Sequence, residues 1–203
     1  MAYEHHVFLS YRRFGEWPRW VEEKFLPLFR HWLGEELGSD IQIFFDKEME
    51  TGVAWPQKLA HALARSHVLV PLWSRQYFNS PWCKAELSHM LEREKKYGFG
   101  TVEHPEGLII PALIHDGEDL PRYVSDRIPA RLQNYTNVRM AKDSPTEEEL
   151  SRAIYKWVPD VAKAIQCAPS YDPSWDQLAV HTFLAQLNAP RPRQEVPPSL
   201  GAL

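Results

Sequence analysis

Five short apolar segments alternate with stretches of helical periodicity along the first 166 residues, and this alternation constrains the fold more than any other feature. The apolar segments are residues 7–11, 41–45, 67–73, 108–114 and 133–138. Apolar strands joined by helical crossovers are typical of a parallel sheet that is covered on both faces. The sequence therefore predicts a three-layer, flavodoxin-like α/β fold, with a five-stranded parallel sheet and helices on both faces.

Two prolines and one weak segment modify this pattern. Pro27 lies inside the helical stretch that follows the first strand, so we expect a kink or a restart there. Pro111 lies in the fourth predicted strand, which indicates a bulge or a position with one unpaired side. The last segment, 133–138, has few apolar residues, and we expect it to be an edge strand.

The third predicted strand is followed by a helix with a sharp beginning. Ser80 suits the N-cap position and Pro81 the first helical position, so the sequence predicts a helix to about Tyr97. Its apolar stripe consists of Cys83, Leu87, Met90 and Leu91. Glu86 lies outside this stripe. A helical glutamate is ordinarily a solvated residue with a basic partner four positions on, but position 90 is Met. The pattern alone leaves both a surface role and a functional role open for Glu86.

Polar and aromatic side chains gather after the first three predicted strands. In α/β sheets, binding sites form at the carboxyl ends of the strands. The residues in or just beyond the first three of these loops are Arg12, Arg13, Asp46, Glu50, Gly52, Trp82 and Glu86. The sequence therefore predicts a functional site at this edge of the sheet.

Charge and cysteine content exclude several classes of function. The net charge of −4 gives no general attraction to nucleic acid or to an anionic membrane. No apolar run approaches the roughly 18 residues of a membrane span. The N-terminus has no signal-peptide pattern, and two cysteines make no disulfide framework, so a cytoplasmic protein is expected. No Cys or His spacing fits a zinc site, and no metal is expected.

The C-terminal part differs in composition from the rest of the chain. Residues 1–166 are predicted to form one domain, and residues 167–203 a C-terminal appendage. From Ala168 on, the chain holds 6 of its 17 prolines. A short helix is expected at about 175–188, docked on the domain or on a partner, followed by a Pro-rich disordered tail.

Three motifs in this order resemble those of Toll/interleukin-1 receptor (TIR) domains, over about residues 5–166. They are Phe8-Leu9-Ser10-Tyr11-Arg12-Arg13, then Phe45-Asp46 with a loop to Gly52, then Ser80-Pro81-Trp82-Cys83-Lys84-Ala85-Glu86-Leu87. The Tyr-Arg-Arg after the first strand is similar to the bacterial branch of the family. The five-stranded flavodoxin-like fold of TIR domains agrees with the fold predicted above.

The resemblance implies an activity, because many TIR domains cleave NAD+ at the nicotinamide–ribose bond. It makes Glu86 the catalytic glutamate and residues 46–52 the loop that gates the site and contacts neighbouring subunits. It also implies NAD+ as substrate with no separate cofactor, self-assembly through TIR–TIR contacts, and a role in bacterial antiphage defence. An activating sensor or an effector that reads the nucleotide product would be a further partner. Two departures concern substrate positioning: Phe14 follows Arg-Arg, and the loop after Asp46 is one residue shorter than in some relatives.

The chemistry of NAD+ cleavage suits these residues. Departure of the cationic nicotinamide needs no acid and leaves positive charge on the ribose, which one carboxylate can stabilise. Trp82 and Trp55 are assigned to stacking on a ring of NAD+, and Arg12 and Arg13 to the pyrophosphate. Four more positions are assigned to substrate binding: Tyr11, Asp46, Glu50 and Gly52. Simpler readings stay open: Trp82 as core, Trp55 as helix anchor, the arginines as surface charges, and Asp46 as a loop cap.

Two other classes of function compete with the enzyme. A non-enzymatic TIR adaptor signals through TIR–TIR contact alone and has no need of Glu86. A receiver-like domain would use Asp46 as a phosphoacceptor, but it needs an acidic cluster after the first strand, where Arg12 and Arg13 stand. The sequence favours the enzyme over both.

Overall fold

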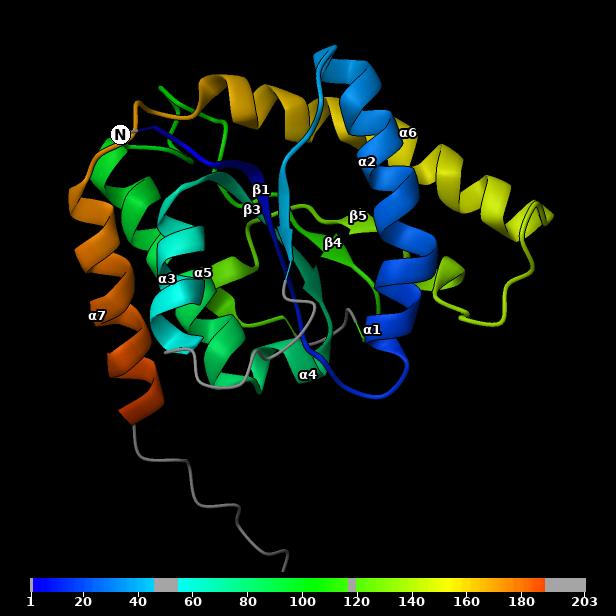
Figure 1. Ribbon diagram of the computed structural model, residues 1–203, viewed down its shortest axis with the longest axis horizontal. Helices are drawn as coiled ribbons and strands as arrows, with labels where there is room; N and C mark the ends of the chain where they lie inside the picture. Colours follow the sequence, from blue (N-terminus) through cyan, green and yellow to red (C-terminus); the bar gives the residue numbers. More distant parts are fainter. Residues whose placement is uncertain (1, 46–54, 117–119, 189–203) are drawn as a thin grey trace, which may run out of the picture.

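The parallel sheet has the strand order of a flavodoxin-like fold. The computed structural model describes residues 2–45, 55–116 and 120–188 (Figure 1). Its five strands pair in the order β2-β1-β3-β4-β5, and every pair is parallel. They are β1 (His5–Tyr11), β2 (Ile43–Phe45), β3 (Ser66–Trp73), β4 (Ala112–Leu113) and β5 (Ala130–Arg131). This order confirms the predicted fold class, and it brings the carboxyl ends of β1 and β3 side by side.

Helices cover both faces of the sheet, as Figure 1 shows. One face packs against α1 (Trp17–Trp20), the π-helical segment η1 (Val21–Phe25), α2 (Leu26–Leu37) and α6 (Pro145–Cys167). The other face packs against α3 (Trp55–Ala64), α4 (Arg75–Phe78) and α5 (Pro81–Tyr97), and α7 (Ser174–Asn188) packs on the outer side of α3 and α5. Two 3₁₀ turns, η2 (Arg122–Val124) and η3 (Gln133–Tyr135), flank β5 along the chain.

The alternation of side chains along β1 separates the two cores. Val7, Leu9 and Tyr11 are buried in the core under α2 and α6. Phe8 is buried in the core under α3 and α5. Because successive strand residues point to opposite faces, Ser10 shares the face of Phe8, and it is directed toward α5.

The kink or restart expected at Pro27 takes the form of a π-helical turn, after which α2 begins with Pro27 in its first turn. Residues 21–25 form η1, and the N–H of Leu26 donates to the carbonyl oxygen of Val21, five residues earlier. Proline has no N–H to donate and its ring crowds the carbonyl four residues before it. The wider turn just before Pro27 lets the chain continue into α2 without a break.

The last two strands are shorter than predicted. Only Ala112–Leu113 of the predicted strand 108–114 forms a ladder, with an isolated bridge between Leu69 and Ile109, because Pro111 interrupts the pairing. The prediction of a strand at 133–138 was wrong, although the fifth strand is an edge strand. The pairing lies earlier, with the Ala130 N–H on the Pro111 oxygen and the Leu132 N–H on the Leu113 oxygen. Residues 133–135 turn away as η3.

The C-terminal helix α7 packs on the domain. It lies along the outer side of α3 and α5 (Figure 1), and its buried side chains are Trp175, Ala179 and Phe183. The expected helix is therefore present and docks on the chain itself. In the part of the chain that the structure describes, no helix is both long and apolar enough to cross a membrane.

Candidate functional site

Glu86 lies at the carboxyl end of β1, on the second turn of α5. The Ser80 hydroxyl accepts the N–H of Cys83 at 3.4 Å, and Pro81 is the first helical residue, so the predicted cap is confirmed. This cap fixes where α5 begins, and one turn later Glu86 meets the sheet. Only 6% of the Glu86 surface is exposed. A buried carboxylate needs hydrogen-bond donors, because its charge is costly to remove from water.

The hydroxyl groups of Ser10 and Tyr77 form a hydrogen-bonded series that ends at the Glu86 carboxylate. The Ser10 hydroxyl donates to Glu86 Oε2, and Ser10 Oγ lies 3.0 Å from Tyr77 Oη. Tyr77 Oη lies 3.4 Å from the carbonyl oxygen of Cys83, in the first turn of α5. Ser10, Tyr77 and Glu86 are all buried. Residues from β1, α4 and α5 thus meet in one polar cluster within an apolar core.

Burial keeps the neighbours of Glu86 protonated. It raises the pKa of the Tyr77 phenol well above its usual value of 10, and the nearby Cys83 and Glu86 act in the same direction. Burial, with the Glu86 charge as the next cause, also raises the pKa of the Cys83 thiol far above its usual value. A protonated thiol is a poor nucleophile. Tyr77 is a hydrogen-bond donor at neutral pH, and Cys83 is a packing residue.

The structure brings one of the two predicted arginines close to this cluster. Arg12 is half-buried, and its charge acts on the Cys83 thiol against the effect of burial. Arg13 is exposed in the loop that follows β1. Tyr11 is buried on the opposite face of the sheet from Ser10, in the core under α2 and α6. The pleat of β1 therefore separates Tyr11 from Glu86.

Both predicted tryptophans flank the site along the chain. Trp82 is half-buried at the start of α5, with its ring centroid 6.0 Å from that of Phe183 on α7. Trp55 is the first residue of α3, but its side chain lies outside the described residues. The predictions for Asp46, Glu50 and Gly52 fall in residues 46–54, which also lie outside them. Substrate binding by all these positions stays a prediction.

Sequence reasoning missed Ser10 and Tyr77 as members of the cluster. Ser10 is a polar residue in an otherwise apolar strand, at a position that alternation assigns to the face of Phe8. That signal was available in the sequence. Tyr77 gave no signal, because its place depends on α4, a single turn capped by Ser74. The approach of this short helix to α5 is a tertiary feature.

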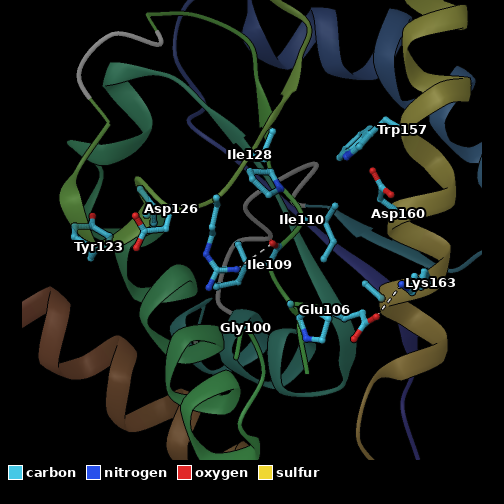
Figure 2. A pocket seen from close by; sticks show the side chains of 16 residues that line it. Gly100, Glu106, Ile109, Ile110, Tyr123, Asp126, Ile128, Trp157, Asp160 and Lys163 are labelled. Atoms are coloured by element: carbon cyan, nitrogen blue, oxygen red, sulfur yellow. Dashed lines mark hydrogen bonds and ion pairs between the residues drawn. The ribbon is translucent and has the colours of Figure 1, made fainter. Parts of the chain in front are cut away.

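A separate cavity of about 590 Å³ lies between α6 and the segments that lead into β4 and β5 (Figure 2). Its lining includes Trp157 and Lys163 from α6, with Ile109 and Ile128 from the sheet side. Lys163 Nζ pairs with Glu106 Oε1 at 2.8 Å in this cavity. Of the predicted site residues that the structure describes, none lines this cavity.

Fold and site define a class of protein: a flavodoxin-like α/β domain with a buried glutamate beside the carboxyl end of its first strand. The family model "TIR domain" matches residues 7–154, so the chain belongs to the TIR domain family. It is also similar to a solved structure of TIR domains in the activated Roq1 resistosome that directly recognises the pathogen effector XopQ. The identity is 19%, the coverage is 91% of this chain and 99% of that chain, and the TM-score is 0.39. Among curated proteins, none matches the chain.

Proposed function

We propose that this TIR domain cleaves NAD+ at the bond between nicotinamide and ribose, with Glu86 as the catalytic carboxylate. The observation that carries the proposal is the burial of Glu86 at the carboxyl edge of the sheet, where Ser10 donates to one of its oxygens. Burial alone does not distinguish Glu86, because Glu94 of the same helix is also buried. Glu94, however, is bound by the N–H groups of Leu108 and Ile109, whereas Glu86 lies at the strand ends where sites form in α/β sheets. Membership of the family supports the assignment, because Glu86 occupies the position of the glutamate in its Trp-Cys-x-x-Glu-Leu motif.

The reaction needs one well-placed negative charge. The C–N bond to nicotinamide breaks, its electron pair goes to the ring nitrogen, and nicotinamide leaves as a neutral molecule. The ribose then carries oxocarbenium-like positive charge, which the Glu86 carboxylate stabilises. Attack by water on that carbon, with loss of a proton, gives ADP-ribose. Attack by an atom of the same nucleotide gives a cyclic isomer, and attack by a second molecule gives a conjugate.

Most of the other predicted residues hold the substrate. Arg12 lies near the first turn of α5 and, with Arg13, supplies charge for the pyrophosphate. Trp82 and Trp55 offer rings for stacking, and the remaining positions are Asp46, Glu50 and Gly52. Tyr11 lies in the core on the opposite face of the sheet and is assigned no contact with NAD+. TIR–TIR assembly would bring the 46–52 loop of a neighbouring subunit to the site. NAD+ is thus a substrate, and no resident cofactor takes part.

The biological setting that suits this activity is bacterial antiphage immunity in the cytoplasm. Depletion of NAD+ stops metabolism in an infected cell, and a nucleotide product can act as a signal. A sensor that triggers assembly, or an effector that binds the product, would be the partner. No contact with nucleic acid or membrane is part of this proposal, in keeping with the net charge of −4.

Release of nicotinamide from NAD+ tests the proposal. The purified protein is incubated with NAD+, with and without a crowding agent that promotes assembly, and nicotinamide is quantified by chromatography. Glu86→Gln is expected to lower the rate by about 10³-fold, because it removes the charge that stabilises the transition state. Glu92→Gln is the matched control, since Glu92 is exposed on the same helix, and it should retain full activity.

Two results would refute the enzymatic proposal. One is equal nicotinamide release by the wild type and Glu86→Gln. The other is a wild-type protein that assembles into oligomers and is incubated with its activator, yet releases no nicotinamide. The second result would favour the non-enzymatic TIR adaptor, which works through assembly alone.

A further inference from the structure

We propose that Ser10 and Tyr77 are positioning residues for Glu86: Tyr77 orients the Ser10 hydroxyl, and Ser10 holds the carboxylate in one orientation as an anion. This inference goes beyond the assignment of Glu86, and its catalytic part rests on the proposed function. Its structural part can be measured without NAD+.

Counting protons gives the direction of the hydrogen bonds. With Glu86 ionised, as proposed, the carboxylate only accepts, so the single proton of the Ser10 hydroxyl points to Glu86 Oε2. The 3.0 Å contact between Ser10 Oγ and Tyr77 Oη must then use the phenol proton. The contact from Tyr77 Oη to the Cys83 carbonyl is longer, at 3.4 Å, and is the weaker alternative. The protons therefore run from Tyr77 to Ser10 to Glu86.

Each of the three hydrogen-bonded residues is held in place by a different strand or helix. Ser10 sits in β1 with β2 on one side and β3 on the other, and its exposed fraction is 2%. Tyr77 belongs to α4, where its N–H donates to the capping hydroxyl of Ser74 at 3.2 Å. Glu86 belongs to α5. Because strand and short helix are both fixed, the hydroxyl groups are preorganised and lose little entropy when they bind the carboxylate.

A donated hydrogen bond favours the charged form of an acid. Ser10 therefore favours the Glu86 anion, against the cost of burial. Among the described residues, the titratable or charged groups that act on Tyr77 or Cys83 include Glu86 itself, Arg12 after β1 and Tyr123 of η2, and Cys83 acts on Tyr77. The phenol of Tyr77 and the thiol of Cys83 stay neutral. They do not add negative charge next to Glu86.

A purely structural role would give a different result. If Ser10 and Tyr77 only fill space, their loss changes stability and leaves the titration of Glu86 unaltered. If they position the carboxylate, Ser10→Ala raises the Glu86 pKa by about one unit, since a hydrogen bond to a charged group is worth about that much. Tyr77→Phe acts in the same direction but less strongly, because Ser10 still donates. Ser10→Thr keeps the hydroxyl and restores the titration.

The test uses the full chain and two readouts. Carbon-13 NMR of a protein labelled at the glutamate carboxyl groups follows the Glu86 titration, with the signal assigned by its loss in Glu86→Gln. The pH profile of nicotinamide release gives the second readout, and its acid limb is expected to move to higher pH in Ser10→Ala. In the same variant kcat should fall about 10- to 100-fold, with little change in KM.

Ser66→Ala is the matched control. Ser66 is a buried serine in β3 whose hydroxyl donates to the Ala62 carbonyl at 2.8 Å, so its loss tests the cost of removing a hydroxyl from the same sheet. It should leave both readouts unchanged. An unaltered Glu86 titration in folded Ser10→Ala would overturn the proposal. A shifted titration in a protein that never releases nicotinamide would support the positioning role and refute the proposed function alone.

Discussion

The guanidinium group of Arg93 lies over the indole ring of Trp175, with Cζ 4.0 Å from the ring centroid. Arg93 comes from α5 and Trp175 from the first turn of α7, and both are fully buried. The arginine donates to the Ser66 carbonyl at 2.9 Å and to Tyr3 Oη at 3.1 Å, which are neutral acceptors. Burial lowers the pKa of Arg93 to about 10. The indole face compensates part of this cost, because it attracts a cation.

We therefore expect Trp175→Ala to be one of the most destabilising substitutions on α7. It removes a buried ring and leaves Arg93 without its aromatic partner, which should lower the free energy of unfolding by about 3 kcal/mol or more. Urea denaturation followed by circular dichroism measures the loss. Leu184→Ala on the same helix is the control, because Leu184 is 49% exposed and its truncation should cost little. Equal losses for the two variants would mean that α7 does not dock in this way.

A second prediction concerns the junction between α5 and β4. Glu94 Oε1 accepts the N–H groups of Leu108 at 2.6 Å and Ile109 at 3.1 Å, and the Glu94 carboxylate pairs with Arg127. Glu94→Gln turns one acceptor oxygen into a donor facing these groups. We expect a loss of about 2 kcal/mol in the free energy of unfolding.

A Cβ at Gly107 would lie 2.9 Å from both Glu94 Oε1 and Arg127 Nη1, so Gly107→Ala should destabilise the same junction.

An exposed ion pair provides the comparison for Glu94. Glu148 and Arg152 pair across one turn of α6, with side chains 64% and 69% exposed. Glu148→Gln should cost less than about 0.5 kcal/mol, because water screens such a pair. If Glu94→Gln and Glu148→Gln cost the same in urea denaturation, the junction at Glu94 does not stabilise the fold as described.

The sequence predicted the parallel sheet because its central strands are long and apolar. For β1 and β3, the pattern of consecutive apolar residues is set by burial on both faces and is therefore visible in the chain itself. The edge strand β5 was harder to predict. Pairing of β5 uses only the residues around Ala130, and its ends depend on the carbonyl groups of Pro111 and Leu113. Such short pairing leaves little trace in side-chain periodicity.

The candidate site likewise has one feature that the local sequence indicates and others that depend on contacts between distant segments. The sequence singled out Glu86 because it lay outside the apolar stripe, lacked a basic partner four residues on, and followed a strand end. Its partners were missed because hydrogen bonds between β1, α4 and α5 depend on the distances between elements. Trp82 shows the limit of residue-type reasoning: an aromatic ring predicted to stack on substrate also contacts Phe183 on α7. The residues around Trp82 do not indicate this contact, because Phe183 lies far along the sequence from them.

Stability should fall in acid because of His89, three residues after Glu86. His89 is fully buried, and in the described structure neither ring nitrogen has a hydrogen-bond partner. Burial, with the charge of Arg93 as the lesser cause, lowers the pKa of His89 from 6.5 to about 3. The unfolded chain binds a proton more readily between these values. The free energy of unfolding should therefore decrease as the pH falls below 6.5, by up to about 1.4 kcal/mol per pH unit.

Substitution of the histidine isolates this effect. His89→Leu removes the titrating group from an apolar site, so urea denaturation between pH 4.5 and 7.5 should show a shallower acid slope than in the wild type. His181, exposed on α7, is the control, and His181→Gln should keep the wild-type slope. His5, His6 and His67 also have a pKa lowered mainly by burial, so some acid dependence remains in every variant. An unchanged slope in His89→Leu would contradict the assignment.

The contact between Trp82 and Phe183 should couple α7 to the start of α5. The ring centroids are 6.0 Å apart with the planes at 49°, and Trp82 lies one turn before Glu86. A double-mutant cycle with Trp82→Leu and Phe183→Leu is expected to give a coupling of about 0.5–1.5 kcal/mol in the free energy of unfolding. No coupling would mean that the two rings do not stabilise each other.

Steady-state kinetics of NAD+ cleavage separate the packing role of Trp82 from a role in stacking on the substrate. If Trp82 also binds a ring of NAD+, Trp82→Leu should raise KM several-fold more than Phe183→Leu, because only the first variant removes the stacking surface.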